Sequence, residues 1–306
     1  MNPTTSKLIF MAGARYRNPS LWQEYERLKQ SEWLGRQDLL GLQLERASRF
    51  LEFVEKHSPY YKKIFRESGF SASKFDSVEN LGQLPLCSKS QLLQHNKLIH
   101  SDYSFSRSFL AETSGTTGSA LEFRKNERWD SINRANMYRA YDWYGVKPWG
   151  RYGYLWGYNI SGRQAAKTRL LDEMQNRFRM FSYDKQDIIA FSKKLTSAAY
   201  LTGYSSMIYE VAKAITSLGL EKPALQMVKG TSEMILDVYQ VAAREAFGCK
   251  IVSEYGAAES GLIAFECPYG SMHINVEDVI VELDNDGQIL VTNLASYSFP
   301  IIRYKL

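Results

Sequence analysis

The chain contains little cysteine, and its three cysteines lie far apart, at Cys87, Cys249 and Cys267. Because an odd number of cysteines cannot pair completely within one chain, a framework of disulfides is excluded. Free thiols persist in a reducing compartment, so the cysteine usage favours a cytoplasmic protein.

Long hydrophobic runs are also missing. The apolar stretch from Leu8 to Ala14 is too short to span a bilayer, and it lacks the context of a cleaved signal peptide. No later stretch approaches the length of a membrane span, and no internal repeat or low-complexity tract is present. These absences exclude a membrane span and favour a soluble protein.

Basic residues do not form runs either. The 38 lysines and arginines exceed the 33 acidic residues by a formal charge of +5, which is spread along the chain. This diffuse excess argues against a nucleic-acid partner and suits a small anionic ligand such as a nucleotide. With 44% hydrophobic and 23% charged residues among 306, the composition is that of a globular protein with two domains, or one large domain with subdomains.

The spacing of apolar residues predicts an α/β fold with three regions. Helical spacing from Leu21 to about Phe65 predicts amphipathic helices, and Ser88 is expected to cap another short helix. The next region alternates strands with helices, which predicts a parallel sheet with crossover helices. From His273 onward, short strands around the Asp286-Gly287 turn predict an antiparallel, barrel-like subdomain. The elements expected in the alternating region are strands at 120–123, 152–158, 199–203, 225–229 and 249–254 and helices at 129–144, 187–195, 207–218 and 236–247.

One hexapeptide combines glycine with hydroxyl side chains, at Thr113-Ser114-Gly115-Thr116-Thr117-Gly118. Glycine lets the backbone approach a phosphate chain closely, and hydroxyls hydrogen-bond its oxygens. The same composition is common in ordinary turns, so the loop alone leaves both interpretations open. The lysine that precedes Ser or Thr in a Walker loop is absent, and Arg124 and Lys125 are the next cations along the chain.

Two further groups of residues admit two interpretations. The aromatic segment Tyr152–Tyr158, which includes Trp156, is typical either of a packed sheet face or of the wall of a substrate site. Cys267 and His273, with Cys249 as a third, carry zinc-binding side chains, but a structural zinc takes four ligands at closer spacing. We therefore expect a buried thiol and a hydrogen-bonded histidine rather than Zn²⁺.

Four segments occur in an order that resembles the adenylate-forming enzymes, in the phenylacetate-coenzyme A ligase branch that includes capsule-biosynthesis relatives. Their shared order extends over about Leu21 to Leu306, although each segment alone is a weak signal. The first segment is a leader with Ser58-Pro59-Tyr60-Tyr61, Leu84-Pro85-Leu86 and Ser88-Lys89, and the second is the 113–118 loop. The third is Gly230-Thr231-Ser232-Glu233 followed by Tyr255-Gly256-Ala257-Ala258-Glu259. The fourth is Glu266-Cys267 with Gly270 and His273, leading to Val291-Thr292-Asn293-Leu294 and Phe299-Pro300-Ile301-Ile302-Arg303-Tyr304.

The resemblance implies ATP-dependent activation of a carboxylic acid as an acyl-adenylate, with Mg²⁺, and transfer to CoA or another thiol or amine acceptor in the full-length enzyme. It implies that Thr116 and Glu259 are catalytic and that Glu259 binds the Mg²⁺ ion. The 113–118 loop would hold the β- and γ-phosphates, and Tyr255 would pack on adenine. Gly256 would be a further cofactor-binding residue, and residues 230–233 would line the other side of the nucleotide. The acyl pocket would lie among Trp156, Tyr158, Tyr204, Ser205 and Ala257.

Two departures from the family's pattern bear on activity. Ser119 and Ala120 follow the loop where the family has lysine and proline, which removes one basic contact and lowers the expected nucleotide affinity. The chain ends at Leu306, before the family's ribose-binding aspartate and its lysine-bearing C-terminal domain. We therefore expect a domain excised from a longer ligase, with little turnover alone. The alternative is a non-catalytic nucleotide-binding or interaction module.

The resemblance also implies a division of the chain. Residues 1–20 would form an N-terminal extension, and 21–306 the adenylate-forming N-terminal domain, made of a helical leader (21–100), an α/β core (101–265) and a β subdomain (266–306). The expected partners are a small carboxylate and a nucleotide, with capsule or O-antigen biosynthesis as the setting. The identity of the acid, the acceptor and the oligomeric state stay open, with a homodimer as one option.

Overall fold

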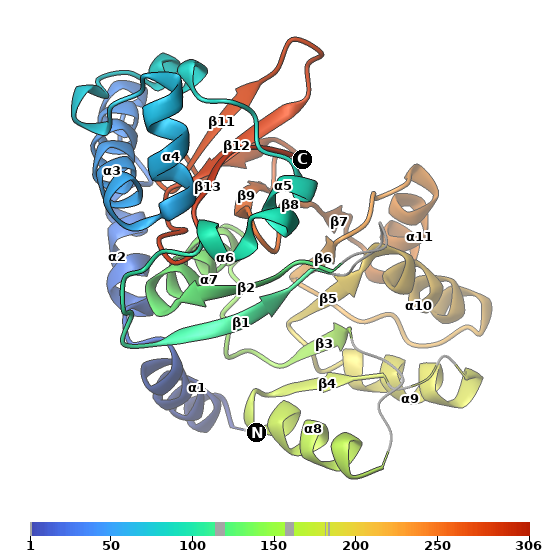
Figure 1. Cartoon of the computed structure of the whole chain (residues 1–306). Helices are drawn as coiled ribbons and strands as arrows, with labels where there is room; N and C mark the ends of the chain where they lie inside the picture. The colour runs from blue at the N-terminus through green and yellow to red at the C-terminus, as the bar shows by residue number, and fades with distance from the viewer. Residues whose placement is uncertain (1, 114–119, 157–161, 181, 183) are drawn as a thin grey trace. The chain divides into compact units, whose positions relative to one another are not determined.

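The computed structural model of the chain describes residues 2–113, 120–156, 162–180, 182 and 184–306. It divides into two compact units, each built from more than one stretch of sequence. Unit 1 comprises residues 1–16, 137–255 and 264–273, and unit 2 comprises residues 17–136, 256–263 and 274–306. The main part of unit 1 is therefore an insertion in the sequence of unit 2 (Figure 1).

Unit 2 begins with the amphipathic helices that the apolar spacing predicts: α2 (Leu21–Ser31), α3 (Arg36–His57) and α4 (Pro59–Ser68). Pro59 occupies the first turn of α4, where its missing N–H costs nothing, and the Ser58 side chain accepts a hydrogen bond from Tyr61 N. The predicted cap at Ser88 is confirmed, since Ser88 forms a capping box with Gln91 at the start of α5. The short elements here are η1 (Ala72–Lys74), η2 (Val78–Gln83), α5 (Lys89–Gln94) and α6 (Asn96–Ile99).

The expected antiparallel C-terminal strands are also present in unit 2. Strands β11 (Val279–Leu283), β12 (Ile289–Asn293) and β13 (Ile301–Lys305) form one sheet in the order β11-β12-β13. The predicted turn between the first two contains Gly287, whose φ of 75° is a conformation that glycine adopts without strain. Unit 2 also contains a hairpin of β1 (Ser108–Glu112) and β2 (Glu122–Asn126). Helix α7 (Glu127–Asp142), which belongs to unit 2 as far as Asn136, confirms the helix expected near 129–144.

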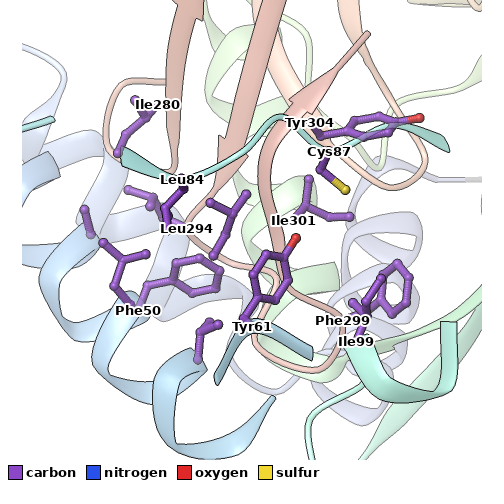
Figure 2. Packing of buried hydrophobic residues seen from close by; sticks show 14 of the residues in the cluster. Phe50, Tyr61, Leu84, Cys87, Ile99, Ile280, Leu294, Phe299, Ile301 and Tyr304 are labelled. Atoms are coloured by element: carbon purple, nitrogen blue, oxygen red, sulfur yellow. The ribbon is translucent and has the colours of Figure 1, made fainter. Parts of the chain in front are cut away.

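The largest hydrophobic cluster joins the leader helices to this C-terminal sheet. Phe50 of α3 and Tyr61 of α4 lie in the same cluster as Leu294, Phe299 and Ile301, as Figure 2 shows. Full burial of such side chains contributes about 1.5–3 kcal/mol each. Segments from opposite ends of the sequence therefore share one core.

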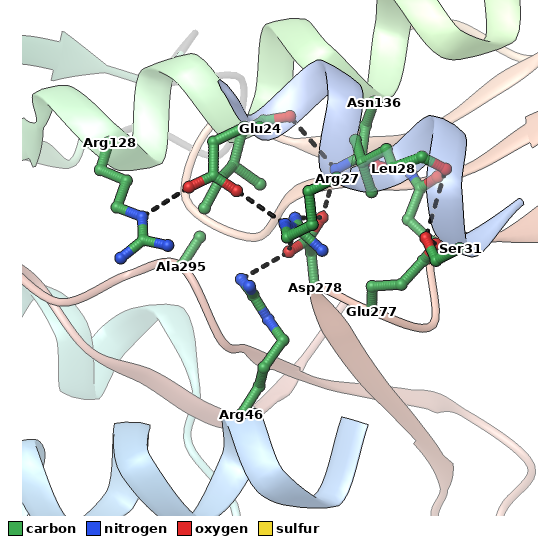
Figure 3. A network of polar contacts seen from close by, with 12 residues as sticks. Glu24, Arg27, Leu28, Ser31, Arg46, Arg128, Asn136, Glu277, Asp278 and Ala295 are labelled. Atoms are coloured by element: carbon green, nitrogen blue, oxygen red, sulfur yellow. Dashed lines mark hydrogen bonds and ion pairs between the residues drawn. The ribbon is translucent and has the colours of Figure 1, made fainter. Parts of the chain in front are cut away.

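A buried network of charged groups holds the same two parts together (Figure 3). Asp278, which is 2% exposed and precedes β11, accepts hydrogen bonds from Arg27 of α2 at 2.9 Å, Arg46 of α3 at 2.7 Å and Asn136 of α7 at 2.8 Å. Arg27 also donates to the buried Glu24 at 2.8 Å. A buried carboxylate is tolerated when its charge is paired and its oxygens are hydrogen-bonded, and Asp278 meets both conditions.

Unit 1 contains the parallel sheet that the alternating pattern predicts, in the order β4-β3-β5-β6-β7 with every neighbouring pair parallel. The register places Gly203 of β5 opposite Gly230 of β6. The strands are β3 (Tyr152–Leu155), β4 (Arg177–Arg179), β5 (Tyr200–Tyr204), β6 (Met227–Thr231) and β7 (Ile251–Val252), with helices α8 (Gly162–Met174), α9 (Lys185–Leu195), α10 (Ser205–Ser217) and α11 (Asp237–Phe247).

One predicted strand is divided in the structure. The segment expected as a single strand at 249–254 forms β7 and then β8 (Glu254–Ala257), with a break at Ser253. The cause is Glu266, which binds Ser253 through both its backbone N–H and its carboxylate. Strands β9 (Gly261–Glu266) and β10 (Met272–Ile274) complete a short sheet in the order β10-β9-β8.

The N-terminal residues are helical, in α1 (Pro3–Arg17). In the described part of the chain, no helix has both the length and the apolar character needed to cross a membrane.

Removing the central carboxylate of the buried network tests its role. Because Asp278→Ala leaves Arg27 and Arg46 without this partner, we expect the free energy of unfolding to fall by about 3–5 kcal/mol. The control is Glu45→Ala, which removes an exposed ion pair with Arg49 on the same helix, α3, and should cost less than about 1 kcal/mol. Urea denaturation followed by circular dichroism measures both, and equal effects would contradict the assigned role.

Two glycine substitutions test the close packing of the parallel sheet. A Cβ atom at Gly203 would lie 2.4 Å from Leu155 Cβ and 2.5 Å from the Leu155 carbonyl oxygen, so Gly203→Ala must push β3 and β5 apart. We expect a loss of about 3 kcal/mol of stability. Gly41→Ala, in α3, meets no atom within 4 Å and should stabilise the chain by about 0.5–1 kcal/mol. In thermal denaturation, the midpoint temperature should fall for Gly203→Ala and rise for Gly41→Ala.

Candidate functional site

Several of the predicted site residues of unit 1 follow directly after strands of the parallel sheet. Trp156 follows β3, Tyr204 ends β5, and Thr231 ends β6. The register pairs Leu155 with Gly203 and Tyr204 with Thr231, so these strand ends are neighbours at the same edge. The carboxyl edge of an open parallel sheet is where α/β proteins bind their ligands. The structure thus brings together three segments that lie far apart in the sequence.

The rings of Trp156 and Tyr204 are stacked at this edge. Their centroids are 4.4 Å apart and their planes differ by 10°, which makes one flat aromatic surface. Ser205 follows as the first residue of α10 and is fully buried, and in the described part of the chain its hydroxyl has no hydrogen-bond partner. The aromatic residues expected to line an acyl pocket are therefore, in part, in contact with each other.

Residues 230–233 make packing contacts and hydrogen bonds within unit 1. A Cβ atom at Gly230 would lie 2.5 Å from Ser205 Oγ and 2.9 Å from Ile251 Cγ2, so glycine is required by packing. Ser232 has a φ of 63°, which costs a non-glycine residue about 1–2 kcal/mol. The Glu233 carboxylate accepts a hydrogen bond from Ser206 N at 2.8 Å and so satisfies the N-terminus of α10. These constraints give the turn a fixed shape.

Sequence reasoning missed two charged residues beside this turn. Lys229 of β6 is 4% exposed, and its Nζ lies 2.6 Å from Oε2 of Glu254. The other carboxylate oxygen of Glu254 accepts a hydrogen bond from the Thr231 hydroxyl at 2.5 Å. The next residue, Tyr255, is 39% exposed. A lysine directly before the Gly230–Glu233 motif, within a buried strand, was the signal available in the sequence.

In unit 2, the segment 256–259 holds the predicted metal ligand. A Cβ atom at Gly256 would lie 2.2 Å from the carbonyl oxygen of Gly261, so the backbone approach of β8 and β9 requires glycine there. Ala257 N donates to Ser260 Oγ at 3.0 Å. Glu259 is 5% exposed, and the Tyr304 hydroxyl donates a hydrogen bond to its Oε1 at 2.7 Å. The role of Tyr304 is a second feature that sequence reasoning missed.

Tyr304 is held firmly in its strand. The Cys87 segment pairs with β13, since Cys87 N donates to Arg303 O and Lys305 N donates to Cys87 O, each at 2.9 Å. Figure 2 shows Cys87 and Tyr304 next to each other. Burial and the neighbouring Glu259 carboxylate raise the pKa of Tyr304 well above its usual value, so the phenol keeps its proton and remains a donor. Burial also raises the pKa of Cys87 to about 11.

The same unit places a cation in the electrostatic field of Glu259. Burial lowers the pKa of Lys125, and the carboxylates of Asp130 and Glu259 oppose that shift. The Lys125 ammonium lies 5.3 Å from the centre of the Trp129 ring, a cation–π distance. Lys125 is one of the two cations that follow the glycine-rich loop in the sequence.

Thr113 closes the hairpin that carries the glycine-rich loop. Its backbone N–H donates to Leu121 O at 3.0 Å, and its hydroxyl accepts from Leu121 N at 2.9 Å. The remaining predicted residues of that loop, and one aromatic residue of the predicted acyl pocket, lie outside the described residues; they are Ser114, Gly115, Thr116, Thr117, Gly118 and Tyr158.

The three cysteines are free thiols. Cys267 is buried, and the His273 ring packs edge-on against Trp143 at 5.4 Å. Within the described ranges, no group of three or more His, Cys, Asp and Glu side chains is placed to hold a metal ion.

The chain is similar in sequence to curated proteins. No protein-family model matches the chain. It is 23% identical over 302 residues to protein CapK of Staphylococcus aureus, a match that covers 93% of this chain and 64% of CapK. A shorter match, 33% identical over 64 residues, links 21% of this chain to 14% of the phenylacetate-coenzyme A ligase of Thermus thermophilus. The chain thus spans less than two thirds of the length of these curated relatives.

Solved structures of 2-hydroxyisobutyryl-CoA ligase share the fold. The complex with 2-HIB-AMP and CoA in the thioesterification state matches with a TM-score of 0.71 and 19% identity over 89% of this chain and 63% of that chain. The open conformation with the same ligands has a TM-score of 0.66 and 18% identity over 86% of this chain and 67% of that chain.

The similarity to CapK along nearly the whole chain agrees with the shorter match to a phenylacetate-coenzyme A ligase. The mixed α/β architecture agrees with that of the CoA ligase structures. Together these findings show that the chain is similar in sequence to CapK and, over a short segment, to a phenylacetate-coenzyme A ligase, and that it shares the fold of the CoA ligase structures, in agreement with the predicted resemblance to the adenylate-forming enzymes.

Proposed function

We propose that the chain binds ATP and a small carboxylic acid and activates the acid as an acyl-adenylate. A carboxylate oxygen of the acid attacks the α-phosphorus of ATP, and the bond from that phosphorus to the bridging oxygen breaks. Pyrophosphate leaves with the electron pair. The task of the protein is to bring the two reactants together and to stabilise the charge that develops on the phosphates.

The observation that carries this proposal is the gathering of predicted ligand-binding segments at one edge of the parallel sheet of unit 1. These segments lie at the carboxyl ends of adjacent parallel strands: Trp156 after β3, residues 204–205 at the end of β5, and residues 230–233 at the end of β6. Backbone strain at Ser232, and a buried Ser205 hydroxyl that has no partner among the described residues, are typical of a ligand site rather than of an ordinary turn. The exposed ring of Tyr255 is available to stack on adenine.

Glu259 has the properties expected of a magnesium ligand. It is a buried carboxylate, and among the described residues its hydrogen-bond partner is Tyr304, bound to Oε1, which leaves Oε2 for another ligand. A buried carboxylate needs a cation or further hydrogen bonds, and Mg²⁺ prefers oxygen ligands. We assign to Glu259 the binding of the Mg²⁺ ion that accompanies ATP, which would offset charge on the phosphates.

The remaining assignments form part of the same proposal. Thr113 and residues 114–118, with Thr116 as the catalytic member, would bind the β- and γ-phosphates, and Gly256 would lie against the adenine. The stacked rings of Trp156 and Tyr204, with Tyr158, Ser205 and Ala257, would contact the acyl group. The 2-HIB-AMP and CoA bound in the similar ligase support an acyl-adenylate that is passed to CoA. A setting in polysaccharide biosynthesis rests on the similarity to CapK.

Calorimetric titration with ATP and Mg²⁺ tests the proposal. Wild-type chain should bind ATP more tightly with Mg²⁺ than without it. We expect Glu259→Ala to lose most of this Mg²⁺-dependent gain, with ATP affinity in Mg²⁺ reduced at least about tenfold, because the metal loses its protein ligand. Thr116→Ala should weaken ATP binding with and without Mg²⁺. Absence of ATP binding by the wild type would argue for a non-catalytic module instead.

The hydrogen bond from Tyr304 gives a second, finer test. Tyr304→Phe removes the donor that orients Glu259, so we expect the Mg²⁺ concentration that half-saturates ATP binding to rise about three- to tenfold. Tyr61→Phe is the matched control, since it removes a buried hydroxyl from the same hydrophobic cluster without touching Glu259. Both variants should lose some stability. The assignment is wrong if their Mg²⁺ dependence is the same.

A further inference from the structure

The backbone pairing between β6 and β7 ends just before the predicted nucleotide-binding residues. These strands pair at Val228 with Ile251 and at Lys229 with Val252. The break at Ser253 follows, so Thr231 on one segment and Tyr255 on the other lie beyond the last pair of this ladder. Beyond the last pair, the two segments are linked by side-chain contacts.

The link is made by one carboxylate. Glu254 binds Lys229 through Oε2 at 2.6 Å and Thr231 through Oε1 at 2.5 Å. Lys229 and Thr231 are two positions apart on β6, so their side chains project from the same face of the strand. Glu254 precedes Tyr255 directly, and the three-residue contact therefore joins the 230–233 turn to the candidate adenine-stacking ring.

Stability alone does not explain the ion pair between Lys229 and Glu254. The side chains of Lys229 and Glu254 are 6% and 17% exposed, so both charges have lost most of their hydration. Apolar replacements of similar volume are often as stable as a buried ion pair, or more so. An ion pair retained at such a position is better explained by the geometry that it imposes.

The direction of the Thr231 hydrogen bond determines what Thr231 can offer a ligand. A carboxylate only accepts hydrogen bonds, so the hydroxyl proton of Thr231 is committed to Glu254. The hydroxyl oxygen then presents lone pairs alone. Its partner on a ligand must be a donor, such as the amino group of adenine or a ribose hydroxyl, because phosphate oxygens are acceptors.

We propose that Lys229 and Glu254 are positioning residues that orient Thr231 as a hydrogen-bond acceptor for the nucleoside part of the nucleotide. This inference rests on the proposed function, since it assumes that the 230–233 turn contacts a nucleotide. It adds two residues to the site and gives the Thr231 hydroxyl a defined role as a hydrogen-bond acceptor.

The decisive variant replaces the ion pair by apolar side chains. Lys229→Met with Glu254→Leu should fold with a melting temperature equal to or above that of the wild type. Its affinity for AMP and for adenosine, measured by calorimetry, should nevertheless fall about tenfold, as in Thr231→Val. Adding Thr231→Val to the double variant should cause little further loss, because the three residues act as one unit. Lys250→Met, which breaks the Lys250–Glu266 ion pair of 2.6 Å in the same unit, should leave both affinities within about twofold.

The outcomes separate the two proposals. If the wild type binds neither AMP nor ATP, the proposed function fails. If it binds them and the folded double variant binds equally well, the positioning role is wrong while the proposed function stands. A loss in Thr231→Val that appears with AMP and not with adenosine would place the hydroxyl at the phosphate and overturn the assignment to the nucleoside.

Discussion

Asp278 is the carboxylate on which the arrangement of unit 2 depends. Its burial beside β11 is tolerated because donors from α2, α3 and α7 converge on it, and each of these helices is thereby fixed against the C-terminal sheet. That sheet contains β13, which presents Tyr304 to Glu259. The position of the candidate metal ligand therefore follows, step by step, from an ion-pair network that contains no candidate ligand-binding residue.

The segment 230–233 shows how one short motif serves structure and ligand together. Gly230 is required by packing, Glu233 satisfies the start of α10, and Thr231 is tied to Glu254. The strained backbone at Ser232 is held in place by these neighbouring contacts. Much of the motif is thus committed to contacts within the protein, and a preorganised turn of this kind loses little entropy when a nucleotide binds.

Much of the fold could be predicted from the sequence because periodicity reports local geometry. The alternation of strands and helices, the cap at Ser88 and the turn at Gly287 are all encoded within a few residues. The pairing of Lys229 with Glu254, the break at Ser253 and the convergence on Asp278 depend on contacts between distant segments. In sequence, those residues look like ordinary charged or polar positions. The same limit applies to the site: the resemblance drew attention to Glu259, whereas Tyr304 becomes its partner only through the fold.

The pairing of Cys87 with β13 has a consequence for the order in which the chain folds. The Cys87 segment forms hydrogen bonds with Arg303 and Lys305, which follow all of unit 1 in the sequence. The parallel sheet of unit 1 is complete once residue 252 has been made, and its strand pairings are more local. Unit 1 can therefore form during synthesis, before β13 has been made and can cover the apolar faces of the leader helices. A ribosome that stalls before residue 299 would leave Phe50 and Tyr61 exposed to aggregation, because their core partners Phe299 and Ile301 have not yet been made.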